Sequence, residues 1–158
     1  MKLFTDPLKV LLTMLLCGAF FTGEIQLFAA IAPLSQKQLD EQSELIITGR
    51  VVAVESQVQK SKIERTLDIH RDRIYNIKLE LINFYKIPPF EQDLRIKEFI
   101  VVEAWRPETR IPPLPGPQGH ESIPKKGDEV KMYLLWNKVT VLWQPLLPNG
   151  IKVVKKEQ

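Results

Sequence analysis

The chain has 158 residues, enough for one domain, and its 44% hydrophobic and 26% charged residues are ordinary for a globular protein. Lysine and arginine exceed aspartate and glutamate by 22 − 19 = 3, a weaker basic excess than a dedicated nucleic-acid-binding domain shows. The one cysteine, Cys17, lies near the N-terminus, which excludes disulfides, thiolate metal sites and cysteine catalysis from the rest of the chain.

Residues 1–32 have the pattern of a targeting segment. A basic start is followed by the short apolar run Val10–Phe21 and by the small residues of "LFAAIA". Because that run is shorter than the roughly 20 residues of a membrane-spanning helix, we expect a cleaved signal peptide. The alternative is an uncleaved N-terminal anchor, which would be the chain's membrane contact. Cys17 follows Leu16 rather than a small residue, so a lipoprotein is not predicted.

A short polar helix and a long first strand are predicted next. Ser35 and Gln38 fit a helix capping box, and Leu39 is the one apolar anchor of that helix. The strand covers residues 45–55, and its apolar residues fall on both faces, as in a strand that is partly covered on its outer side. Gly49, in the middle of the strand, predicts a bulge or a sharp coil.

The middle of the chain alternates between strands and long polar segments. Residues 57–73 are charged and almost without core residues, which predicts a long excursion at a hairpin tip. Strands are predicted over 74–85 and 99–105. In the first of these, the residues expected to face the core are Tyr75, Ile77, Leu79 and Leu81. Residues 106–128 hold six of the 12 prolines and predict an ordered loop without repetitive structure.

Three further strands are predicted over 130–136, 139–143 and 151–154, and Asn149-Gly150 predicts a hairpin turn between the last two. No long amphipathic helix and no internal repeat is visible. The pattern predicts a mainly β fold in residues 33–158. We expect a small antiparallel, five- to six-stranded OB-like Greek-key barrel with a short N-terminal helix after the leader.

Several segments carry a resemblance to a known family. "ELIITGRVVAVE", "YNIKLELINFYK", "VVEAW", "PKKGDEVKMYLLW" and "NGIKVV", over about residues 36–154, are similar in layout to the netrin-module, inhibitor-type OB barrels related to tissue inhibitors of metalloproteases. That family has secreted bacterial relatives, and the resemblance implies an OB fold. The animal inhibitors use an N-terminal cysteine and disulfides, whereas this chain has no cysteine after Cys17. The resemblance therefore does not imply metalloprotease inhibition.

No catalytic apparatus is visible in the sequence. His70 and His120, each with an acid nearby, are the candidates for an envelope metal site or hydrolase, and Glu80 and Glu103 are the candidates for an acid/base pair. We expect both histidines in solvated loops and both glutamates facing water. The serines lack a nucleophile motif. The prediction is a protein with no enzymatic activity, no metal and no cofactor.

The candidate binding residues are basic or aromatic and lie in or beside the two long polar segments, since loops on a rigid barrel carry recognition. They are Trp105, Arg106, Arg110, Lys125, Lys126, Arg71 and Arg73. Export argues against nucleic acid, and the tryptophans suit a glycan or an envelope protein. We predict an exported, periplasmic or secreted binding module. The alternative is a structural or assembly protein held by an uncleaved anchor. The ligand and the oligomeric state stay open.

Overall fold

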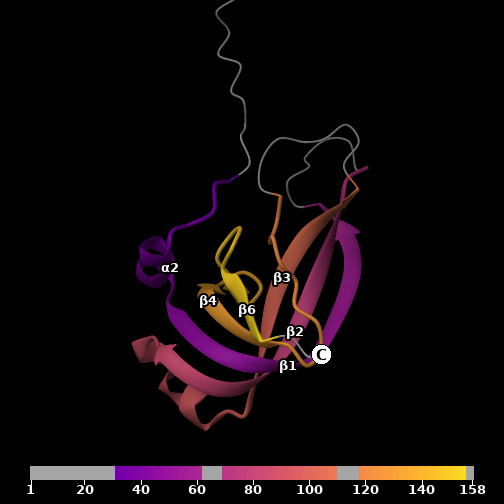
Figure 1. Ribbon diagram of the computed structural model, residues 1–158. Coiled ribbons are helices and arrows are strands. Elements are labelled where there is room, and N and C mark those ends of the chain that lie inside the picture. Colours follow the sequence, from indigo (N-terminus) through magenta and orange to yellow (C-terminus); the bar gives the residue numbers. More distant parts are fainter. Residues whose placement is uncertain (1–30, 62–68, 110–117, 156–158) are drawn as a thin grey trace, which may run out of the picture.

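The computed structural model describes residues 31–61, 69–109 and 118–155 (Figure 1). Almost all of the predicted leader, and Arg110, lie outside the described residues. Within the described ranges, no helix has the length and apolar character needed to cross a bilayer.

Six strands in one curved sheet make up the body of the molecule. They are β1 (Leu45–Lys60), β2 (Arg71–Lys86), β3 (Phe99–Thr109), β4 (Glu129–Asn137), β5 (Leu142–Pro145) and β6 (Ile151–Lys155). Helix α2 (Gln36–Gln42) precedes β1, and the 3₁₀ helix η1 (Pro89–Ile96) joins β2 to β3. The strand order is β1-β2-β3-β5-β4-β6, and β1 also pairs with β4, which closes a ring. The prediction of a mainly β fold is confirmed.

One pair of strands corrects the prediction of an antiparallel sheet. β3 and β5 run parallel and share a single paired position, Val102 with Trp143. The other described pairs are antiparallel. The reason is geometric: a closed ring of five strands cannot alternate direction all the way round, so one neighbouring pair has to be parallel.

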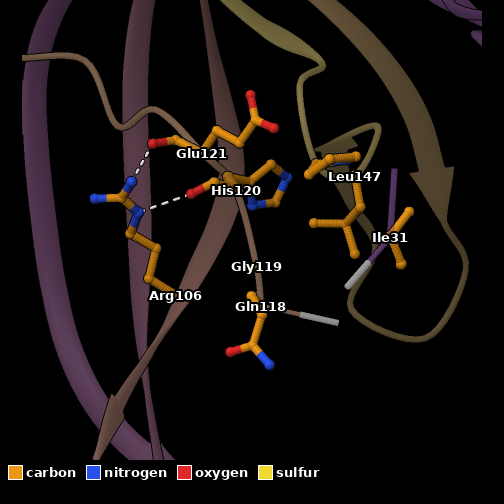
Figure 2. Close-up of a pocket in the computed structure, with 8 residues that line it drawn as sticks. Ile31, Arg106, Gln118, Gly119, His120, Glu121 and Leu147 are labelled. Carbon is orange, nitrogen blue, oxygen red and sulfur yellow. Dashed lines mark hydrogen bonds between the residues drawn. The ribbon is translucent and has the colours of Figure 1, made fainter. Parts of the chain in front are cut away.

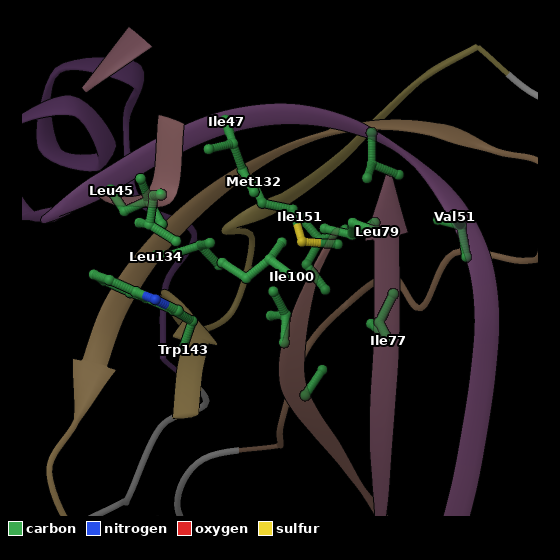
Figure 3. Close-up of a cluster of buried hydrophobic side chains, with 14 residues drawn as sticks. Leu45, Ile47, Val51, Ile77, Leu79, Ile100, Met132, Leu134, Trp143 and Ile151 are labelled. Atoms are coloured by element: carbon green, nitrogen blue, oxygen red, sulfur yellow. The ribbon is translucent and has the colours of Figure 1, made fainter. Parts of the chain in front are cut away.

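Alternate side chains of the strands fill the interior of the ring (Figure 3). On β2, Ile77 and Leu79 are fully buried, while Tyr75 and Leu81 pack against the core partly buried, as predicted. The other strands and η1 contribute the rest. These residues are Leu45, Ile47, Val51, Leu94, Ile100, Val102, Ala104, Val130, Met132, Leu134, Trp143 and Ile151.

Gly49 marks the bulge that the sequence predicted. The pairing register between β1 and β2 shifts between Thr48 and Gly49. A Cβ atom at Gly49 would lie 2.7 Å from the carbonyl oxygen of Glu80 on the neighbouring strand. Only glycine permits this close approach of the two backbones, and the local irregularity helps β1 to curve around the core.

Beyond the ring, β1, β2 and β3 continue as a three-stranded arm at one end of the molecule (Figure 1). The predicted excursion over 57–73 is wrong at both ends, because Gln57–Lys60 pairs with Arg71–Ile74. β3 likewise reaches Thr109, inside the predicted loop. Except for Val58, the arm residues that lie outside the predicted strands are polar or proline, so no hydrophobic alternation reveals these pairings in the sequence.

The predicted hairpin between the last two strands is also wrong. β5 and β6 each pair with β4, along successive halves of one edge. Between them, Leu146 donates to the Tyr133 carbonyl, and Tyr133 donates to the Gly150 carbonyl, both at 2.9 Å. β5 and β6 therefore act as one strand interrupted by a loop. Asn149 lies in that loop, and its side chain accepts from the Leu34 N–H at 2.9 Å and donates to the Leu34 carbonyl at 2.8 Å.

Helix α2 packs on a small second core outside the ring. Its N-terminus has a capping box, in which the Ser35 hydroxyl accepts from the Gln38 N–H and the Gln38 side chain accepts from the Ser35 N–H. Leu39 is fully buried against Ile46, Tyr133 and Leu146.

Candidate functional site

The boundary between β3 and β5, which we call the seam, is where the ring is least completely paired. The two strands meet only at Val102 and Trp143, which both point into the core. The residues next to this bridge therefore point outward. On β3 they are Val101 and Glu103, and on β5 they are Leu142 and Gln144. The seam opens on both sides of the bridge, and three cavities lie along it.

The first cavity, which we call the polar groove, has a volume of about 180 Å³ and lies over the outer face of β3. Its floor carries a row of hydrogen-bonded side chains. Gln144 Nε2 donates to Glu103 Oε1 at 2.5 Å, and Asn137 Nδ2 donates to Gln144 Oε1 at 2.9 Å. Trp105, half-buried, lies two residues from Glu103 on the same face of the strand. Asp72 of β2 and Lys60 at the end of β1 complete the charged part of the wall.

The second cavity, the apolar opening, has a volume of about 200 Å³ and lies on the other side of the bridge. Phe99 and Val101 of β3 form one wall, and Val141 and Leu142 form the other. Its inner end reaches the core at Trp143. Phe90 stacks on that indole with ring centroids 6.4 Å apart, and Trp136 meets it edge-on at 5.2 Å.

The third cavity, of about 390 Å³, lies beside residues 118–121, a segment that we call the strap (Figure 2). The strap fills the seam beyond Trp105. His120 N–H donates to the Trp105 carbonyl, and Glu121 N–H donates to the Pro148 carbonyl, both at 2.9 Å. Gly119 has φ +75°, and a Cβ atom there would lie 2.4 Å from the Trp105 carbonyl oxygen. The strap thus approaches β3 as closely as a neighbouring strand does.

The side chain of His120 bridges the two walls of the seam. Nε2 lies 3.0 Å from the Pro145 carbonyl, which can only accept, so Nε2 carries the proton. Nδ1 then accepts from the Trp105 N–H at 3.1 Å. Burial lowers the pKa of His120. The Pro145 and Trp105 carbonyls, which would accept from the protonated ring, oppose this shift, and the nearby Arg106 charge lowers the pKa further. His120 is therefore a neutral structural link between β3 and β5.

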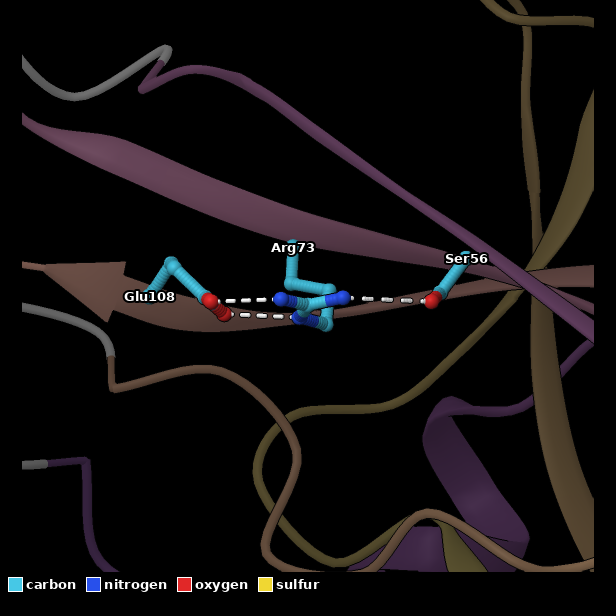
Figure 4. Close-up of polar contacts among 3 residues, drawn as sticks. All are labelled: Ser56, Arg73 and Glu108. Atoms are coloured by element: carbon cyan, nitrogen blue, oxygen red, sulfur yellow. Dashed lines mark hydrogen bonds and ion pairs between the residues drawn. The ribbon is translucent and has the colours of Figure 1, made fainter.

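The structure brings four of the predicted binding residues to the arm. Trp105 lies in the polar groove, whereas the Arg106 guanidinium donates to the His120 carbonyl at 2.7 Å and also to the Glu121 carbonyl. Arg71 donates to the His70 carbonyl at 3.0 Å. Arg73 pairs with Glu108 through two hydrogen bonds of 2.7 and 2.5 Å (Figure 4). That bonding raises the pKa of Arg73 and lowers the pKa of Glu108.

Two other predicted residues lie elsewhere. Lys125 and Lys126 are exposed on a turn that bonds to Val51 of β1. Val51 is seven residues from Val58, the partner of Arg73, or about 23 Å along the strand. The lysines and the arm therefore do not form one surface. Arg110 lies outside the described residues.

Both histidines correct the expectation of solvated loops. His70 and His120 are only 1% and 2% exposed. His70 precedes Arg71, which pairs with Thr109, while His120 bonds Trp105, so about four residues of β3, roughly 13 Å, separate the two positions. Within the described residues, no group of three or more His, Cys, Asp or Glu side chains is arranged to hold a metal ion.

Comparison with known proteins adds no assignment. No protein-family model matches the chain, and neither the curated proteins nor the solved structures contain a significant match. The case for a function therefore rests on the seam itself.

The sequence singled out Trp105, and Glu103 only as a candidate acid/base partner of Glu80, but not Gln144 or Asn137. Glu103, Gln144 and Asn137 come from three strands, and the Glu103–Gln144 bond joins residues 41 positions apart. The one available signal was the alternation of β3, which places Glu103 and Trp105 on the same face.

Proposed function

We propose that this chain is an exported, non-enzymatic binding module that holds a glycan in the polar groove on the outer face of β3. The proposal includes an OB-type Greek-key barrel, related in layout to the netrin-module barrels. The order β1-β2-β3-β5-β4 with β1–β4 closure supports it. OB barrels bind oligosaccharides and oligonucleotides on the face of their second and third strands and on the adjacent loops, which is where the polar groove lies.

The single observation that carries the proposal is the hydrogen-bonded row of Glu103, Gln144 and Asn137 beside Trp105. Sugar hydroxyls both donate and accept hydrogen bonds, and a row of carboxylate and amide groups offers both kinds of partner. The apolar face of a pyranose ring packs on an aromatic side chain, and the half-buried Trp105 supplies one at the rim. A few polar groups on a partly apolar concave surface are typical of small-ligand sites.

Calorimetry with soluble peptidoglycan fragments and a panel of neutral oligosaccharides tests the proposal. We expect the purified protein to bind at least one of these, and Trp105→Ala to weaken that binding at least tenfold. Glu103→Gln keeps the shape of the row but removes its charge, and we expect a smaller loss. Lys125→Ala, on an exposed turn away from the arm, is the matched control and leaves binding unchanged. Absence of glycan binding, or binding that Trp105→Ala does not affect, would contradict the proposal.

A further inference from the structure

The polar groove and the apolar opening lie next to each other along β3, β4 and β5. Val101 and Glu103 are successive outward residues of β3, and Leu142 and Gln144 are successive outward residues of β5. The step from an apolar to a polar wall therefore takes about 6.6 Å on both sides of the seam. Any ligand longer than one sugar ring that lies along the seam meets both surfaces.

We propose that the ligand is an amphiphilic glycan, an inference that rests on the proposed function. The sugar of this ligand lies in the polar groove, and its hydrocarbon chain enters the apolar opening. Phe99 and Val101 are 37% and 40% exposed around a cavity that reaches Trp143, so apolar surface is accessible from solvent there. Contiguous exposed apolar surface of this kind marks an interaction site.

Val141, on the rim of the opening, supplies an independent observation. It has φ 56°, in the left-handed region, and is 64% exposed. A β-branched residue is strained there, and asparagine or glycine would fit this backbone better. We therefore include the exposed, strained Val141 side chain in the proposed ligand site. Strain of this kind concentrates at ligand-binding positions.

The charges at the rim favour a single hydrocarbon chain over a membrane surface. Glu91 and Lys97 form an ion pair of 3.9 Å beside the opening, and Lys78 Nζ lies 4.6 Å from the centre of the Phe99 ring, so both signs are present. A surface that docks on anionic lipid is instead rich in lysine and arginine around its apolar residues. The hydrocarbon chain of an amphiphilic ligand does not require an excess of basic residues at the rim, because the sugar holds the ligand in the adjoining polar groove.

A series of alkyl β-glucosides from methyl to octyl, each below its critical micelle concentration, tests the inference by calorimetry. We expect affinity to rise about fourfold for each methylene that enters the opening. The double variant Val101→Thr/Val141→Asn keeps one β-branched shape and relieves the strain at the other position. It should flatten the dependence on chain length while leaving methyl glucoside binding unchanged. Trp105→Ala should weaken every member of the series.

The outcomes separate the two proposals. If methyl and octyl glucoside bind equally, or if the double variant keeps the dependence on chain length, the apolar subsite is wrong and the glycan site stands. If no glucoside binds but the panel of oligosaccharides does, the amphiphile inference is again overturned alone. If the double variant converts a dimer to a monomer in sedimentation, a second copy occupies the opening instead. Failure of every glycan to bind overturns both proposals.

Discussion

β3 and β5 separate on both sides of the Val102–Trp143 bridge, and a different segment lies at the gap on each side. Beyond Trp105, where β3 and β5 no longer pair, the strap enters the seam, and His120 bonds the backbone of both walls. Beyond Val101, η1 lies beside the seam, where Phe90 stacks on Trp143, and a cavity lined by apolar side chains and by Glu91 and Lys97 reaches the core. The first side shows how a sheet closed in a ring satisfies backbone groups that no strand pairs. The second retains exposed apolar surface that folding alone does not require.

The difference predicts that substitutions on the strap side change stability, whereas substitutions on the open side change binding. The largest effect is expected for His120→Ala. This change leaves the Trp105 N–H and the Pro145 carbonyl without their partner and creates a cavity, so we expect the free energy of unfolding to fall by about 3 kcal/mol. Urea denaturation measures it. A loss below about 0.5 kcal/mol would mean that the His120 link does not hold the seam.

The contribution of His120 to the free energy of unfolding should also depend on pH. Because burial lowers the pKa of His120, the unfolded chain binds a proton at that residue below about pH 6.5, whereas the folded chain stays neutral until a lower pH. The free energy of unfolding therefore falls as pH drops from about 6.5, and His120 has no effect above that range. His120→Gln keeps a donor and an acceptor but does not titrate. Denaturation between pH 7.5 and 5.5 should show a shallower decline for this variant than for the wild type; parallel curves would contradict the assignment.

On the open side, Val101→Thr should leave stability almost unchanged. The side chain is 40% exposed and keeps its β-branched shape, so we expect a change within about 0.5 kcal/mol in thermal or urea denaturation. A loss comparable to that of His120→Ala would show that the apolar opening is part of the structural core, and would remove the contrast between the two sides of the bridge.

The smallest effect is expected at the Arg73–Glu108 pair on the arm. Both side chains are about one-third exposed, and an ion pair in water contributes little because solvent screens it. Arg73→Gln should therefore unfold at the same urea concentration as the wild type and bind the same glycans. A clear loss of glycan binding in this variant would move the binding site from the polar groove to the opposite face of the arm.

The sequence predicts local features of this molecule well and non-local features poorly. The alternation on β2 depends on residues that are close together in the chain, and the residue type alone of Gly49, a glycine inside a strand, predicts its bulge. The antiparallel assignment failed at the β3–β5 pair because that pair follows from ring closure, which no local pattern encodes. The outer part of the arm was missed because its residues, except for Val58, are polar or proline.

The candidate site was predictable only in part, for the same reason. Trp105 could be selected as an aromatic residue beside a polar segment. The amides of the polar row, Asn137 on β4 and Gln144 on β5, lie near Trp105 only because β3 and β5 meet at the seam. The burial of His120 depends on the path of the strap between two walls, and a polar, proline-rich sequence around it favours a solvated loop. Contacts that depend on how the ring closes could not be derived from spacing.

The most direct test of the central claim is an NMR titration of ¹⁵N-labelled protein with octyl β-glucoside below its critical micelle concentration. We predict saturable shifts of the backbone amides at Val101–Trp105 and Leu142–Gln144, with a shift of the Trp105 indole N–H and unchanged amides in α2. Saturable shifts confined to the strap or the Lys125 turn would contradict a binding groove on the outer face of β3. The absence of saturable shifts at any position, with octyl glucoside and with the panel of oligosaccharides alike, would also contradict it.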